Sequence, residues 1–548
     1  MNIKRICVFC GSAGGRRSAY QEAAVQIGAN LAECSLKAKA LMVLGTASDA
    51  GKSLTVGALC RIMRQDGFDV APFKAQNMAL NSFATREGLE IGRAQAMQAE
   101  AARVEPHVDM NPILLKPTSD FGSQVVINGK VLGNYSGVDY YRLKPQLLNA
   151  VSSAYRRLAA RHEVIVLEGA GSPVEMNLKD RDVVNMQMAE IADAACLLVT
   201  DIDRGGVFAS LVGTYTLLEP QERRRFCGFL INKFRGDASL FTPGIGYLEA
   251  RLSQPCLGVI PYLRDHGIDD EDSVSLERRA VRPPFDRKDC LCVCVIGLPY
   301  LSNFTDFTAL ENVPGVVVYY TRRPEEARAA DVLILPGSKN TIPDLLWLRK
   351  NGWELVIESH AAAGKPLLGI CGGFQMLGSE IRDPHHTESD IEFVPGFNLL
   401  DFTTVLEREK VTRQATARFA QPNPLGSDDY DQSPLFSGYE IHLGETLMRN
   451  GTQPLFEMQR LGDAKGHHDG AISADGRVLG TYLHGLFDSA EGLGLLLNHW
   501  RKICGKEKSS SDVTDPLVER EKRYDALADH FRRNLRMDVI YRALDEQR

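Results

Sequence analysis

Residues 366–378 read PLLGICGGFQMLG, and this stretch decides the fold of the second half of the chain. Its first residues suit a buried strand, the glycines after Cys371 permit a sharp turn, and the apolar residues beyond begin a helix. A cysteine at such a corner is held clear of the sheet, and the helix N-terminus behind it favours the thiolate. The pattern predicts a nucleophilic Cys371, with a buried structural cysteine as the alternative.

The same stretch resembles the nucleophile elbow of class I glutamine amidotransferases, which release ammonia from glutamine. The resemblance implies a flavodoxin-like domain with Cys371 as nucleophile and Gly372 as a backbone donor to the oxyanion. Residues 332–339 read VLILPGSK and end in a loop where that family places its second oxyanion donor. Gly337 or Ser338 would therefore act with Gly372.

A candidate base follows a later apolar strand, in the stretch VLGTYLHGLF of residues 478–487. His484 is placed to face Cys371 there, and His442 is the second candidate because it resembles another family motif. Many class I amidotransferases carry a glutamate two residues after the histidine, where this chain has Leu486. We therefore expect a Cys–His pair with an unidentified orienting group, a His484 pKa that is not strongly raised, and slow glutamine hydrolysis without the other substrates.

A phosphate-binding loop opens the first half of the chain, where residues 40–53 read ALMVLGTASDAGKS. Backbone N–H groups of such a loop and the helix N-terminus behind it hold phosphate, while Lys52 neutralises charge and Ser53 can ligate Mg²⁺. The loop is one residue longer than usual and resembles that of dethiobiotin synthetase and its relatives, which activate a carboxylate with ATP. The predicted ATP-binding residues of the loop are Gly45, Thr46, Gly51, Lys52 and Ser53.

Three residues at strand ends extend this resemblance. Lys74 follows an apolar strand where that family places a lysine near the carboxylate and the γ-phosphate; the alternative is a solvated surface lysine. Glu168 ends a buried strand, so we predict that it binds Mg²⁺, with a turn-capping carboxylate as the alternative. Asn232 resembles the asparagine that reads adenine in the same family.

Residues 74–82 (KAQNMALNS), 168–173 (EGAGSP) and 199–208 (VTDIDRGGVF) are similar to the cobyric acid synthase family of the cobalamin pathway. The resemblance runs from about Lys37 to the C-terminus. It implies ATP- and glutamine-dependent amidation of the b, d, e and g carboxylates of adenosylcobyrinic acid a,c-diamide, with Mg²⁺ and no tightly bound cofactor.

Three other functions stay open at this point. The sister cobyrinate a,c-diamide synthase performs the same chemistry on two other carboxylates. CTP synthase shares the domain order, although Leu486 argues against its usual triad. A P-loop regulatory ATPase with an inactive amidotransferase domain is the third, although an intact Cys371 and His484 argue against it.

The predicted organisation is an α/β chain of two parallel-sheet domains with additions. Residues 6–12 read ICVFCGS and suit a strand that enters a glycine turn. Residues 1–36 thereby resemble the opening of the lysine-decarboxylase-like phosphoribohydrolases, but the later motif of that family is absent, so we expect a fusion remnant or an alternative start, without that activity. A C-terminal tail with apolar helical spacing should pack on the amidotransferase domain. The expected bounds are 1–36 for the appendage, 37–275 for the ATP domain, 276–289 for a linker, 290–500 for the amidotransferase domain and 501–548 for the tail.

Composition limits the partners. The chain has 548 residues, a net charge of −7 and a pI near 6.0, so it lacks the basic footprint of a nucleic-acid binder. No apolar run reaches the length of a membrane span. Twelve cysteines in so long a chain suit free thiols in a reducing compartment, which predicts a cytoplasmic protein. The oligomeric state is left open.

Overall fold

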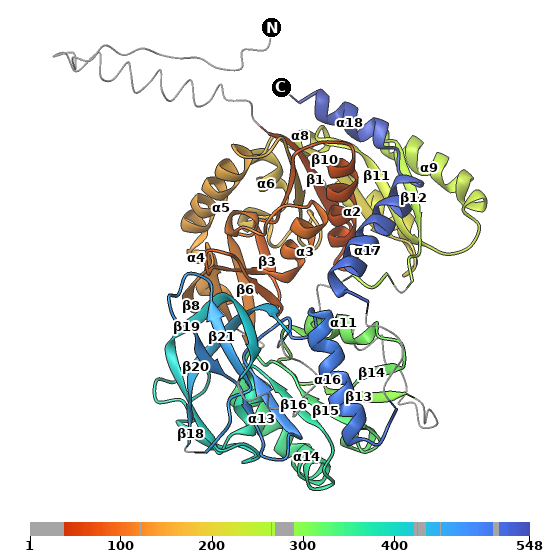
Figure 1. The fold of residues 1–548 in the computed structure, drawn as a ribbon. Helices are drawn as coiled ribbons and strands as arrows, with labels where there is room; N and C mark the ends of the chain where they lie inside the picture. The colour runs from red at the N-terminus through yellow and green to blue at the C-terminus, as the bar shows by residue number, and fades with distance from the viewer. Residues whose placement is uncertain are drawn as a thin grey trace, which may run out of the picture.

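The computed structural model describes residues 38–119, 122–264, 266–268, 290–420, 425, 434–449, 451–507 and 514–547. The appendage expected at the N-terminus, with its resemblance to phosphoribohydrolases, and the linker expected at residues 276–289 lie outside this part. Two α/β domains lie next to one another (Figure 1). The red-to-yellow domain contains the phosphate loop, and the green-to-blue domain contains the cysteine elbow.

The first domain is built on a six-stranded parallel sheet in the order β12-β11-β10-β1-β9-β2. Its strands are β1 (Lys39–Gly45), β2 (Val70–Phe73), β9 (Val164–Glu168), β10 (Ala195–Asp201), β11 (Phe226–Phe234) and β12 (Cys256–Pro261). In β1, Leu41 and Val43 point to one face, and Met42 and Leu44 point to the other. Each face packs its own apolar core, as predicted for a parallel sheet buried on both sides.

Helices cover both faces of this sheet. On the Leu41 face lie α2 (Lys52–Gln65), α3 (Arg93–Ala101), α17 (Pro516–Arg532) and α18 (Met537–Asp545). On the Met42 face lie α5 (Lys144–Ala159), α6 (Met186–Ile191), α7 (Val207–Leu217) and α9 (Thr242–Leu252). Short helices are α4 (Gly137–Arg142), α8 (Pro220–Arg223), η1 (Val108–Met110), η2 (Lys179–Arg181) and η3 (Ala238–Phe241). The phosphate loop joins β1 to α2 at the carboxyl edge of the sheet, where ligands bind in such folds.

Two small sheets lie between the first domain and the second (Figure 1). One has the strand order β3-β6-β7-β8, and the other is the hairpin β4-β5. Their strands are β3 (Gln76–Met78), β4 (Ser82–Ala84), β5 (Glu90–Gly92), β6 (Ile113–Ser119), β7 (Gly122–Ile127) and β8 (Lys130–Ser136). The 74–82 motif contains β3 and the first residue of β4, and it runs from the ATP domain to the amidotransferase domain.

The second domain has a six-stranded sheet in the order β14-β13-β15-β16-β24-β23, in which only β23 is antiparallel to its neighbour. Its strands are β13 (Leu291–Ile296), β14 (Val316–Thr321), β15 (Val332–Leu335), β16 (Leu367–Ile370), β23 (Ala471–Ile472) and β24 (Val478–Thr481). Its helices are η4 (Phe304–Phe307), α11 (Thr308–Glu311), α12 (Pro324–Ala327), α13 (Thr341–Lys350), α14 (Trp353–Ala362), α15 (Gly372–Leu377) and α16 (Ala490–Ile503). Helices again cover both faces, which confirms the predicted α/β class.

A further sheet of the second domain was not expected from the sequence, in which residues 382–432 form a long polar segment. The strands are β17 (Glu380–Arg382), β18 (Phe393–Pro395), β19 (Phe402–Phe419), β20 (Phe436–Met448), β21 (Phe456–Arg460) and β22 (His467–Asp469). In β19 buried and more exposed residues alternate near both ends, so fewer than half of its side chains are apolar and the stretch is polar overall. His385 and His386 lie in the loop between β17 and β18.

The C-terminal tail is helical as expected, but it packs on the ATP domain, not on the amidotransferase domain. Helix α17 lies along α2, and α18 lies beside β1 and β11 (Figure 1). Arg61 of α2 is fully buried, with Nε 2.8 Å from Asp525 and Nη2 2.7 Å from Glu521. Tyr524 and Leu527 pack in the same core, so α17 contacts α2 through both ion pairs and apolar side chains. None of the described helices is long and apolar enough to cross a bilayer.

Candidate active sites

Cys371 stands at the corner between β16 and α15, which confirms the strand–turn–helix prediction. Its φ is +52°, a region that residues with a side chain rarely adopt and that recurs at functional turns. The Sγ atom lies 3.4 Å from the carbonyl oxygen of Ile441, and the residue is 6% exposed. A Cβ on Gly373 would lie 2.0 Å from the carbonyl oxygen of Leu335, so this turn requires glycine. Its role as nucleophile stays a prediction.

His484 follows β24, and Cys371 is among the neighbours that influence its pKa. Its Nδ1 lies 2.7 Å from Oδ2 of Asp306, which is carried by the short helix η4. The other oxygen of Asp306 accepts a hydrogen bond of 3.2 Å from the backbone N–H of Gly485. Burial opposes a charged imidazole, but the charge and hydrogen bond of Asp306 and the contact with Cys371 outweigh it and raise the His484 pKa to about 10. At neutral pH His484 therefore carries a proton beside the sulfur.

Asp306 is the orienting group that the sequence left unidentified, and it makes one expectation wrong. The pKa of His484 is strongly raised beside this carboxylate, not left near its usual value. The partner comes from 178 residues earlier in the chain, while Leu486 is buried in an apolar core. Residues 300–307 have no periodic pattern that marks one aspartate. The only available signal was a position after a buried strand, at the edge where ligands bind.

Gly337 and Gly372 bring two backbone turns together beside this pair. The Cβ position of Gly372 lies 3.0 Å from the backbone nitrogen of Ser338, and that of Gly337 lies 3.5 Å from Cε1 of His484. The Ser338 hydroxyl donates to Asp344, at 2.6 Å, which fixes the turn. These are the loops from which both oxyanion donors are predicted, and their roles stay predictions.

His442 lines the same cavity as Cys371 but has other partners. Its Nε2 lies 3.3 Å from Oε1 of Glu440, and its Nδ1 lies 3.1 Å from the carbonyl oxygen of Gly444. Its ring stacks on Tyr482 with a centroid separation of 3.8 Å. Burial lowers the pKa of His442 despite the opposing effect of Glu440. This histidine therefore suits the cavity wall better than the role of base.

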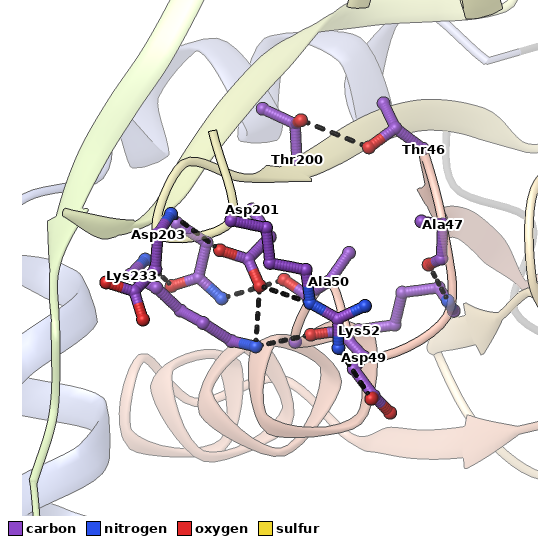
Figure 2. A network of polar contacts seen from close by, with 12 residues as sticks. Thr46, Ala47, Asp49, Ala50, Lys52, Thr200, Asp201, Asp203 and Lys233 are labelled. Atoms are coloured by element: carbon purple, nitrogen blue, oxygen red, sulfur yellow. Dashed lines mark hydrogen bonds and ion pairs between the residues drawn. The ribbon is translucent and has the colours of Figure 1, made fainter. Parts of the chain in front are cut away.

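The phosphate loop wraps around Lys52 (Figure 2), which confirms the predicted order of strand, loop and helix. Lys52 Nζ donates to the carbonyl of Ala47 at 2.9 Å, and a Cβ on Gly45 would lie 2.9 Å from that nitrogen. Gly51 has a φ of +95°, and a Cβ there would lie 2.1 Å from Nδ2 of Asn232. Glycine at these two positions therefore lets the side chains of Lys52 and Asn232 lie close to the loop backbone.

Asn232 and Thr46 hold this loop in place. Asn232 Nδ2 donates to the carbonyl of Ala50 at 3.0 Å, and its Oδ1 accepts from the backbone N–H of Lys233 at 2.9 Å. The Thr46 hydroxyl donates to the Thr200 hydroxyl at 3.0 Å (Figure 2), which joins the loop to β10. Recognition of adenine by Asn232 stays a prediction.

The 199–208 motif closes the opposite side of the loop with ion pairs. Arg204 lies 2.8 Å from Asp49, and Lys233 lies 2.9 Å from Asp201 (Figure 2). The motif therefore borders the phosphate loop, as a polar edge of the active site should.

Glu168 joins three side chains at the carboxyl end of β9. Its Oε1 accepts from Ser53 at 2.9 Å and from Lys74 at 2.8 Å, and its Oε2 accepts from Gln98 at 2.5 Å. The structure thus brings the predicted Ser53, Lys74 and Glu168 together. Gln98 was missed because an amide inside helix α3 carries no motif.

The same residues fit a magnesium ion. A carboxylate and a hydroxyl are oxygen ligands that Mg²⁺ prefers, and Oε1 of Gln98 is buried there without a hydrogen-bond partner. Within the described ranges, no group of three or more His, Cys, Asp and Glu side chains could hold a metal. Ser53 and Glu168 would therefore share the ion with phosphate oxygens and water, as is usual for Mg²⁺.

Two cavities lie on opposite faces of the β6–β7 pair. Lys116 and Gln124, which are paired across the strands, line the cavity of Cys371. Their strand neighbours Leu115 and Val125 line a cavity of about 600 Å³ that extends to the residues following β9. Alternate residues of a strand point to opposite faces. One small sheet therefore separates the cysteine centre from the cavity beside the phosphate loop.

A phosphate-loop domain with a buried carboxylate, joined to a cysteine elbow with a His–Asp pair, defines the class of glutamine-dependent amidoligases. Comparison with protein families agrees. Residues 292–492 match the model of the CobB/CobQ-like glutamine amidotransferase domain. Residues 41–272 match that of the CobQ/CobB/MinD/ParA nucleotide binding domain.

Curated relatives match nearly the whole chain, and the chain belongs to the cobyric acid synthase family. The cobyric acid synthase of Syntrophobacter fumaroxidans is 47% identical over 511 residues, 93% of this chain and 99% of the relative. That of Caldanaerobacter subterraneus subsp. tengcongensis is 48% identical over 515 residues, with the same coverage. That of Clostridium botulinum (strain Loch Maree) is 46% identical over 502 residues, 91% of this chain and 98% of the relative.

Proposed function

We propose that the protein converts carboxylates of a corrinoid to amides, with ATP activating each carboxylate and glutamine supplying the nitrogen. The substrate is adenosylcobyrinic acid a,c-diamide, amidated at its b, d, e and g carboxylates. One observation carries the proposal: the cysteine centre and the phosphate loop adjoin cavities that share one small sheet as a wall. We infer that ammonia released at the first passes this wall to reach a carboxylate activated at the second.

The glutaminase half begins when the Cys371 sulfur attacks the amide carbon of glutamine. Backbone N–H groups of residues 337–338 and of Gly372 hold the oxyanion of the tetrahedral intermediate. His484 gives its proton to the departing ammonia, and it later takes a proton from the water that hydrolyses the thioester to glutamate. Asp306 keeps the imidazole oriented, with its Nε2 side free to exchange protons with the sulfur and the leaving group.

The ligase half uses the phosphate loop. The loop and Lys52 hold the ATP phosphates while an oxygen of the corrinoid carboxylate attacks the γ-phosphorus and ADP leaves. Ammonia then attacks the acyl carbon, and inorganic phosphate leaves as the amide forms. Lys74 forms an ion pair of 2.8 Å with the predicted magnesium ligand Glu168 and would neutralise the reacting carboxylate. Ser53 and Glu168 would hold Mg²⁺, whose charge stabilises the phosphate oxygens.

The large cavity beside the loop suits a corrinoid. Met78, Tyr135 and Tyr140 form part of an apolar wall for the macrocycle, and charged residues are available for its carboxylates and amides. The charged lining residues are Lys144, Glu175, Lys179, Arg181 and Asp182. The volume of about 600 Å³ lies in the range of small-molecule sites. We assign the reaction to the cytoplasm, because ATP is the energy source and free thiols persist in reducing compartments.

Mass spectrometry of the products tests this proposal. Purified full-length protein with adenosylcobyrinic acid a,c-diamide, ATP, Mg²⁺ and glutamine should give four successive amides. Cys371→Ala should lose the glutamine-dependent products but keep those made with ammonium salt. Unchanged corrinoid with either nitrogen source would contradict the proposal. Two amidations of cobyrinic acid, with none of the diamide, would identify the sister reaction.

A further inference from the structure

Residues 74–82 connect the two catalytic centres by one stretch of backbone. At one end, Lys74 Nζ donates to Glu168 beside the phosphate loop, at 2.8 Å. At the other end, the backbone N–H of Ser82 donates to Oδ1 of Asn303 in the amidotransferase domain, at 2.9 Å. The proposed mechanism uses only the first residue of this motif, although the family resemblance covers all nine.

Asn303 lies directly beside the imidazole of the glutaminase centre. Its Nδ2 is 3.4 Å from Nδ1 of His484, and its carbonyl oxygen accepts from the backbone N–H of Asp306 at 3.0 Å. The residue is 3% exposed and has a φ of +54°. The residue that the ATP domain holds through its side chain is therefore also the one that starts the turn carrying Asp306.

A second contact reaches the same imidazole from its other side. The hydroxyl of Tyr439 donates to the carbonyl oxygen of Ser82 at 3.3 Å. The ring of Tyr439 stacks on His484, with centroids 5.3 Å apart and planes inclined by 19°. The backbone N–H and the carbonyl of Ser82 thus hold two residues that enclose the catalytic histidine.

We propose that Asn303 is a positioning residue of the glutaminase centre and that the backbone of Ser82 holds it in its working position. The ATP domain thereby completes the centre that hydrolyses glutamine. This inference rests on the proposed function, because it takes Cys371 and His484 as the hydrolytic pair. Asn303 acts through Asp306 and His484. It fixes the turn that carries Asp306 and contacts the imidazole, so that the ring stays aligned with the sulfur of Cys371.

Three substitutions separate the possible contributions of this residue. Asn303→Leu keeps the size of the side chain but removes its polar atoms, and Asn303→Gly suits the positive φ but removes the side chain. Both should lower kcat for glutamine hydrolysis by about tenfold or more and leave KM within about twofold, because proton transfer is affected and binding is not. Asn303→Asp keeps an acceptor for the Ser82 N–H and should retain more activity than either. Amidation with ammonium salt should stay at the wild-type rate in all three.

Two further variants serve as controls, one for the substitution itself and one for the proposed function. Asn351→Leu makes the same change at an exposed end of α13 in the same domain and should leave glutamine hydrolysis at the wild-type rate. The inference is overturned if Asn303→Leu hydrolyses glutamine within about twofold of wild type, or if its ammonium-dependent amidation falls in parallel. Cys371→Ala separates the two proposals. Glutamate release by Cys371→Ala would refute the proposed function itself, whereas its loss alongside a normal Asn303→Leu would refute only the positioning role.

Discussion

At the residue scale, the carboxylate of Asp306 lies against the imidazole of His484 where neither side chain is more than 4% exposed. Asp306→Asn would keep the shape but remove the charge that holds the proton on the imidazole. Glutamine hydrolysis should then fall by about 10² or more, within the usual range for a lost acid–base function. Glutamate release measures this, and ammonium-dependent amidation serves as the internal control. A near-normal rate would show that glutamine hydrolysis does not depend on the charge of Asp306.

The same pair makes stability depend on pH. The folded-state pKa of His484 is raised from its usual 6.5 to about 10, so folding favours the protonated ring. That stabilisation is complete below about pH 6.5 and is lost as the pH rises through about 10. Urea unfolding at intervals between these values should show wild type losing stability with rising pH. Asp306→Asn should lose less over the same range, and equal slopes for the two proteins would count against the assignment.

Sequence patterns located the residues that end strands or turns but not those that become neighbours only in the folded chain. Cys371 follows a buried strand and Glu168 ends one, and both strands form as predicted. Asp306 and Gln98 lie in stretches without a distinctive period, so their partners could not be inferred. The expectation of slow uncoupled glutamine hydrolysis rested on Leu486, and Asp306 removes that reason.

At the element scale, Lys52 begins α2 and lies inside the phosphate loop. Lys52→Ala should abolish amidation with glutamine and with ammonium salt alike, because no carboxylate would be activated. A loss of about 10³ corresponds to about 4 kcal/mol of barrier, at about 1.4 kcal/mol per tenfold. Glutamine hydrolysis measured alone should persist. An ammonium-dependent rate near that of wild type would exclude the loop from the reaction.

Helix α17 is predicted to stabilise the ATP domain. Leu527 is 1% exposed and packs in the core shared with α2, so Leu527→Ala should lower the free energy of unfolding by about 2–5 kcal/mol. Leu517 lies on the same helix but is 53% exposed, and Leu517→Ala should change the free energy of unfolding by no more than about 0.5 kcal/mol. Thermal unfolding followed by ATP-domain probes compares the two. Equal effects would mean that α17 does not belong to that core.

The strands and helices of both large sheets could be predicted because their apolar runs and glycine turns are local signals. Two features could not. The long strand β19 is polar on one side, and its apolar residues alternate over a stretch that lacks turn residues. The docking of the tail depends on the buried Arg61 of α2, which a sequence pattern would place on a solvated helix face.

At the scale of the whole molecule, a buried group of charges joins the two domains. Glu90 of β5 binds Lys116 of β6 at 2.8 Å and Lys410 of β19 at 2.6 Å. Burial lowers the pKa of Lys116 to about 7, and the charge of Lys410 contributes. Lys410→Met should loosen the contact between the domains and let more ammonia escape. The ratio of glutamate released to amide formed should therefore rise, while the exposed Lys465→Met should leave it unchanged. An unaltered ratio in Lys410→Met would show that this contact does not limit the loss of ammonia.

Helices α17 and α18 pack on the ATP domain although they follow the amidotransferase domain in the sequence. This arrangement affects the order in which the two domains can fold as the chain is synthesised. Residues 516–545 complete the apolar core on the face of the first sheet that carries α2 and α3, so the ATP domain needs residues that are synthesised after the whole amidotransferase domain. Among the described residues, the amidotransferase core is formed by residues 291–500 with Cys504 packed against it, and it can fold while the earlier domain is still open. We expect a purified chain truncated after residue 507 to resist protease around β13 to β16 but to be cut within α2. Protection of α2 at that length would show that the ATP domain folds without its C-terminal helices.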